Sequence, residues 1–133
     1  MLKKTVTYTD YDGVERTETF YFNLSEAEIV EMELGTEGGW RERMQRIIDS
    51  KDAPTIMREF KKLIMMSYGK KSDDGRRFIK SEDISNEFVQ TEAYNKIFME
   101  LVTDSKAAAE FANGIIPTGS AEKSRQNILP ANQ

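Results

Sequence analysis

Apolar and polar residues alternate near the start of the chain with the period of a β-strand. The alternation runs over residues 5–9, and residues 14–22 end in three consecutive aromatic side chains. A two-residue Asp-Gly turn would split the apolar face of the pair. A three-residue loop at 11–13, with Gly13 in the left-handed region, instead gathers that face and sets Thr5 opposite Thr19 and Thr7 opposite Thr17. The pattern therefore predicts a hairpin with strands at about 3–9 and 14–22 and this longer loop.

From residue 24 onward, apolar residues recur with the 3.6-residue period of amphipathic helices. Ser25 and Glu28 have the spacing of a capping box, with Leu24 and Ile29 as its hydrophobic staple. Ser81 and Thr91 have the position and chemistry of helix caps. Gly69 follows a long apolar stripe as a helix terminator would. The predicted helices cover about 26–34, 40–50, Asp52 to Gly69, 82–89, 92–103 and 106–113, with a short extended or irregular link at 76–80.

These elements predict an α+β fold, a predominantly α-helical bundle of five to six helices with an N-terminal β-hairpin packed against it. The ordered part should be a single domain over residues 1–117. Residues 118–133 are rich in Ser, Gly, Asn, Gln and Pro, and their only large apolar side chains are Ile128 and Leu129. We therefore expect a disordered C-terminal tail.

Composition narrows the chemistry that the chain can perform. Its 133 residues contain no His and no Cys, which excludes disulfides, thiolate nucleophiles, imidazole bases and the usual zinc sites. The sequence shows no signal peptide and no apolar run long enough to span a bilayer. We therefore expect a cytosolic protein that does not contact a membrane. The net charge is −4, yet residues 35–70 carry eight basic against five acidic side chains. A mildly basic middle of this kind is most often solvated helix surface.

Two short motifs partly match known ligand-binding loops, one for calcium and one for phosphate, but each lacks residues that its ligand requires. Residues 10–13 resemble the start of a calcium loop, but the third carboxylate and the bidentate glutamate are missing. Residues 35–39 are rich in glycine but lack the Lys-Ser/Thr of a phosphate loop. We therefore expect no cofactor, no metal and no enzymatic activity.

The predicted exposed methionines point to binding instead. Flexible methionine side chains suit surfaces that adapt to varied apolar partners. Of the seven methionines, Met44 and Met57 fall on or beside buried stripes, whereas Met65, Met66 and Met99 are predicted to point outward. Met65 lies on its helix among basic residues. The candidate partner-binding residues are Met65, Met66, Met99, Arg58 and Lys62.

A nucleic-acid surface is the weaker alternative. Arg76 and Arg77 precede Phe78, and clustered cations beside an aromatic ring can bind phosphate and stack on bases. The acidic segments on both sides of the basic middle count against it. We therefore expect no nucleic acid as partner, and salt-sensitive DNA or RNA binding that charge reversal at the two arginines abolishes would favour the alternative.

The run of the sequence resembles the tail assembly chaperones of long-tailed (siphovirus-type) bacteriophages and prophages, specifically the short form encoded just before the tape measure protein. The stretches that carry the resemblance are 3–10, 20–28, 67–71, 77–81, 91–94, 107–111 and 116–117.

The resemblance implies a non-enzymatic protein that binds the tape measure protein, keeps its apolar helices from aggregating and helps to recruit the tail tube protein. It also implies that the protein acts in the host cell cytoplasm and is absent from the mature virion. Relatives are often made in two forms, the longer one by a ribosomal frameshift, so a frameshifted longer form of this protein is a further candidate partner. A weak homo-oligomer is left open. The alternative within the same setting is a structural virion component, such as a tail or head-to-tail connector module.

Overall fold

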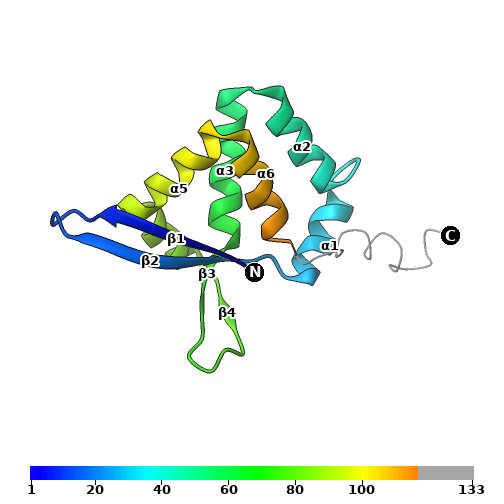
Figure 1. The fold of residues 1–133 in the computed structure, drawn as a ribbon. Helices are drawn as coiled ribbons and strands as arrows, with labels where there is room; N and C mark the ends of the chain where they lie inside the picture. Colours follow the sequence, from blue (N-terminus) through cyan, green and yellow to red (C-terminus); the bar gives the residue numbers. More distant parts are fainter. Residues whose placement is uncertain (117–133) are drawn as a thin grey trace.

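The computed structural model describes residues 1–116, and within them four strands and six helices follow one another (Figure 1). The helices gather on one side of the first hairpin, which strands β1 and β2 form, and the second hairpin, which β3 and β4 form, projects away from them. The elements are β1 (Leu2–Thr9), β2 (Glu15–Phe22), α1 (Glu26–Gly35), α2 (Trp40–Ser50), α3 (Ala53–Ser67), β3 (Tyr68–Lys71), β4 (Phe78–Ile79), α4 (Glu82–Val89), α5 (Glu92–Thr103) and α6 (Ser105–Gly114). The α+β fold with a helical bundle is confirmed. The predicted tail at 118–133, together with Pro117, lies outside the described residues.

The N-terminal hairpin has the register that the threonine pattern predicts. β1 and β2 are antiparallel, with Thr5 opposite Thr19 and Thr7 opposite Thr17. The hydroxyl groups of each pair lie 2.9 Å apart. Gly13 closes the three-residue loop at φ +81°, a region that glycine enters without steric cost. The longer loop is therefore confirmed over the two-residue turn.

The sheet contains two strands that the sequence analysis missed. The predicted third helix ends at Ser67, and its supposed terminator Gly69 lies in β3, where it pairs with Tyr21 of β2. β3 then pairs with β4, which gives the order β1-β2-β3-β4. The link at 76–80 thus contains a strand. The expected Gly69 terminator was wrong because its backbone is held by sheet pairing, without the positive φ of a helix end.

The helix starts follow the caps that the sequence contains. The Ser25 hydroxyl accepts the Glu28 amide at 3.1 Å, and the Glu28 carboxylate accepts the Ser25 amide at 2.8 Å, which completes the capping box. Ser81 and Thr91 each accept an amide three residues on, so α4 and α5 begin where predicted. These caps fix where the chain enters each helix, and hence which face each helix buries.

An aromatic cluster joins the sheet to the helices at the centre of the core. The rings of Tyr68 and Phe88 stack with centroids 4.0 Å apart, and Phe22 meets Phe111 edge-on at 5.2 Å. Strand β3 therefore contributes to the core through Tyr68, a residue that lies inside the predicted third helix. Ile115, directly after α6, is fully buried, and its carbonyl accepts the Leu24 amide. These contacts fasten the end of the helical layer to the start of α1.

Candidate functional site

A groove of about 470 Å³ lies between α1, α2 and α3. The three helices follow one another in the chain, and α2 and α3 each bury one stripe of their amphipathic sequence, as predicted. The groove runs along the edge of these buried stripes, and it is lined by Met32, Thr36, Trp40, Arg43, Met44, Glu59, Lys62, Leu63, Met65 and Met66.

Four of the groove's side chains are methionines, and they come from all three helices. Met44 of α2 is buried, and Met32 of α1 and Met65 of α3 are half-buried. Met66 is 43% exposed, so its thioether is open to solvent. Methionine has three rotatable side-chain bonds and a polarizable sulfur, so such a lining can adapt to apolar surfaces of different shape.

One wall of the groove carries a charged cluster. Arg43 of α2 forms an ion pair with the buried carboxylate of Glu59 on α3, and Lys62 lies 3.8 Å from the same carboxylate. Burial by itself would raise the pKa of Glu59, but the hydrogen bond and charge of Arg43 outweigh it and leave this pKa below its ordinary value. The groove therefore combines an apolar, methionine-rich lining with fixed positive charge.

The opposite wall is held in place by a buried glutamate. Glu33 of α1 accepts the Trp40 amide at 3.1 Å, at the first residue of α2. The preceding residue, Gly39, supplies no side-chain cap, so the Glu33 carboxylate satisfies this helix start and meets its positive dipole. This contact fixes α1 against α2. The sequence analysis missed it, because only the tertiary structure places the two residues together.

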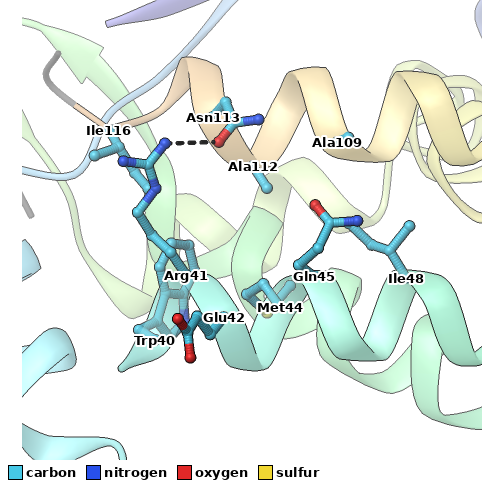
Figure 2. A pocket seen from close by; sticks show the side chains of 10 residues that line it. All are labelled: Trp40, Arg41, Glu42, Met44, Gln45, Ile48, Ala109, Ala112, Asn113 and Ile116. Carbon is cyan, nitrogen blue, oxygen red and sulfur yellow. Dashed lines mark hydrogen bonds between the residues drawn. The ribbon is translucent and has the colours of Figure 1, made fainter. Parts of the chain in front are cut away.

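The other side of α2 borders a smaller pocket against α6. This pocket has a volume of about 210 Å³ and includes Ala109 and Ala112 of α6 (Figure 2). Arg41 donates a hydrogen bond to the side chain of Asn113 at 3.1 Å, which joins the two helices across the pocket. The pocket has less than half the volume of the methionine groove, and the groove contains the predicted Lys62, Met65 and Met66, so we take the groove as the candidate site.

The structure brings together some of the predicted partner-binding residues. Met65, Met66 and Lys62 line the methionine groove. Met99 lies on α5, is 53% exposed and does not line it, and Arg58 is exposed on α3 outside it. Met57, expected on or beside a buried stripe, is 46% exposed, which corrects that expectation.

The weaker nucleic-acid candidate lies elsewhere in the fold. Arg76 and Arg77 are exposed in the connection between β3 and β4. Phe78 is half-buried, with its ring directly over Gly69. Its ring is therefore only partly available for stacking on a base.

Within residues 1–116, no three His, Cys, Asp or Glu side chains lie where they could hold a metal ion. None of the helices there is both long and apolar enough to cross a membrane.

Comparison with known proteins decides the family. A family model described as phage tail assembly chaperone matches residues 1–132. The chain belongs to this family. No curated protein and no solved structure is significantly similar to it. Membership in the phage tail assembly chaperone family confirms the resemblance seen in the sequence and implies that the protein interacts with tail proteins.

Proposed function

We propose that this protein binds the tape measure protein of its phage and assists assembly of the tail tube around it, without enzymatic activity. The observation that carries the proposal is the methionine groove between α1, α2 and α3. Family membership supports a role in tail assembly, and the groove supplies a surface suited to an apolar partner.

The mode of binding that suits this groove is a helix laid along it. An amphipathic helix can place its apolar stripe in a hydrophobic groove, as helical peptides do in other recognition proteins. Met32, Met65 and Met66 are neither deeply buried nor locked by branching at the β-carbon, so they can repack around different side chains. Such plasticity suits a chaperone that must contact successive helices of one long partner.

The tail tube protein is the second partner, recruited to the tape measure protein while the chaperone is bound. A frameshifted longer form of the same protein and a weak homo-oligomer would add valency, which raises the overall affinity without new contacts. The protein acts in the host cell cytoplasm and leaves before the virion is mature.

Co-expression with the tape measure protein tests the proposal. A tagged chaperone should capture the tape measure protein and raise its soluble fraction, whereas a tag-only control should do neither. Absence of capture, with the tape measure protein equally insoluble in both cultures, would contradict the proposal.

Washed virions provide a second test. Mass spectrometry should find the protein absent or far below the copy number of tail components. Abundant copies would instead identify it as a structural virion component, such as a tail or head-to-tail connector module.

A further inference from the structure

The methionine groove continues into a second, polar hollow. This hollow lies at the C-terminal end of α1 and is lined by Gly35, Thr36, Glu37, Arg43 and Arg46. Thr36 and Arg43 line both spaces, so the apolar groove and the polar hollow are contiguous. A ligand that lies in the groove and extends past Arg43 therefore reaches Arg46.

The two arginines of this hollow differ in what they contact. Arg43 is engaged by Glu59 on the wall of the methionine groove. Arg46 lies one turn further along α2 and makes no ion pair with any residue in 1–116. Glu37 is the hollow's only acidic lining residue, against two guanidinium groups. The hollow therefore has an excess of positive charge and a guanidinium able to take a carboxylate.

The helices α2 and α3, which line the methionine groove, also carry a net positive charge. Residues 40–67 carry seven basic and four acidic side chains, although the whole chain is acidic. Lys62 lines the methionine groove with its side chain largely in solvent. An acidic flank on a bound helix would thus meet positive charge from both α2 and α3.

We propose that the groove and the hollow form one continuous site for an amphipathic helix that carries an acidic residue beside its apolar stripe. The stripe packs on Met32, Met65 and Met66, and the carboxylate pairs with Arg46. Under the proposed function, this helix belongs to the tape measure protein, so the inference depends on that function. The site selects helices by apolar stripe and acidic flank together, because either part alone leaves half of it unfilled.

The pair at Arg46 lies at an exposed position and is screened by salt. Binding should therefore weaken as salt is added, while the methionine contacts are insensitive to it. Charge reversal at Arg46 should reduce or invert this salt dependence, because an attraction that salt screens is replaced by a repulsion that salt relieves.

Overlapping peptides of about 25 residues, each long enough for several helical turns, that span the tape measure protein would serve as probes in fluorescence anisotropy. Arg46→Glu is compared with Arg76→Glu, a matched charge reversal at an exposed residue far from the groove. The peptides that bind the wild-type protein should carry acidic residues beside an apolar stripe. Arg46→Glu should weaken their binding roughly tenfold at low salt, and Arg76→Glu less than twofold.

Equal effects of the two reversals, or no effect of Arg46→Glu with its circular dichroism unchanged, would overturn the inference. If the intact tape measure protein is captured while no peptide binds, the helix-in-groove site is wrong and the proposed function stands. If the intact tape measure protein is not captured at all, the proposed function fails and this inference fails with it.

Discussion

Arg43 of α2 and Glu59 of α3 form an ion pair across the wall of the methionine groove, and the two partners differ strongly in exposure. The Glu59 side chain is 7% exposed, whereas that of Arg43 is 41% exposed. If the ion pair breaks, water can therefore solvate the Arg43 guanidinium but not the buried Glu59 carboxylate. The pair joins α2 to α3 where both line the candidate site.

Glu59→Gln should lower the stability of the fold by about 1–2 kcal/mol. This is less than the cost of breaking a fully buried pair, because the freed Arg43 guanidinium can turn to solvent. Urea denaturation at neutral pH would measure the change. A loss below a few tenths of a kcal/mol would show that the pair contributes nothing to holding the groove together.

The same pair should make stability depend on acid pH. Burial opposes ionisation of Glu59, but Arg43 outweighs it and holds the pKa of this carboxyl below its ordinary value of 4.5. A carboxyl with a lowered pKa in the folded state stabilises the fold above its unfolded pKa and loses that contribution as the pH falls through its folded pKa. The stability difference between the wild type and Glu59→Gln should therefore be constant from about pH 6 to 8 and shrink below about pH 4. A difference that grows on acidification would contradict the assignment.

Gly69→Ala should destabilise the junction between α3 and the sheet. A Cβ at this position would lie 2.6 Å from a ring carbon of Phe78 and 2.8 Å from the Ile79 carbonyl oxygen. The backbone oxygen cannot move without breaking the pairing of β3 and β4, so a loss of about 1–3 kcal/mol is expected. Gly35→Ala is the matched control, because it meets nothing within 4 Å and lies at the end of a helix. Thermal denaturation should separate the two variants, and equal midpoints would contradict the close packing at Gly69.

Lys80→Met should loosen the contact between the second hairpin and α1. The Lys80 ammonium donates to the Asn23 carbonyl at 3.1 Å and to both carboxylate oxygens of Glu28 at 2.7 Å. Because both charged partners are only partly buried, the expected loss is about 1 kcal/mol. Lys106→Met, at an exposed position of α6, serves as control in the same denaturant titration. Indistinguishable midpoints for the two variants would show that this network adds no stability.

Local chemistry made the first hairpin and the helix starts predictable from the sequence. The Thr5–Thr19 and Thr7–Thr17 pairs and Gly13 together allow one register, because a one-residue slip would turn the apolar side chains outward. The capping box of Ser25 and Glu28 is likewise complete within four residues. Both signals need no knowledge of the rest of the fold.

Strand β3 could not be predicted in this way. Tyr68 lies four residues after Ile64 and so continues the apolar stripe of α3, and Gly69 then has the position of a helix terminator. The pairing of both residues with β2, more than 40 positions earlier in the chain, overrides this local pattern. Tertiary pairing therefore decided where α3 ends.

The candidate site was predictable only in part. Helical phase correctly placed Met66 in the open, but it could not show that Met32 and Met44 meet Met65 across three helices. Met57 was expected on or beside a buried stripe of α3, but its side chain is 46% exposed. Periodicity gives the direction of a side chain around its helix, but not whether a neighbouring element extends far enough to cover it.

Binding of the tape measure protein in the methionine groove is tested most directly by the contrast between Met66→Asp and Met57→Asp. Both residues lie on α3 and are similarly exposed, at 43% and 46%, but only Met66 lines the groove. Both variants should keep a thermal midpoint near that of the wild type, because neither side chain is buried. In co-expression with the tape measure protein, Met66→Asp should reduce capture roughly tenfold, and Met57→Asp should leave it within twofold of the wild type. Equal capture by the two folded variants would contradict the claim.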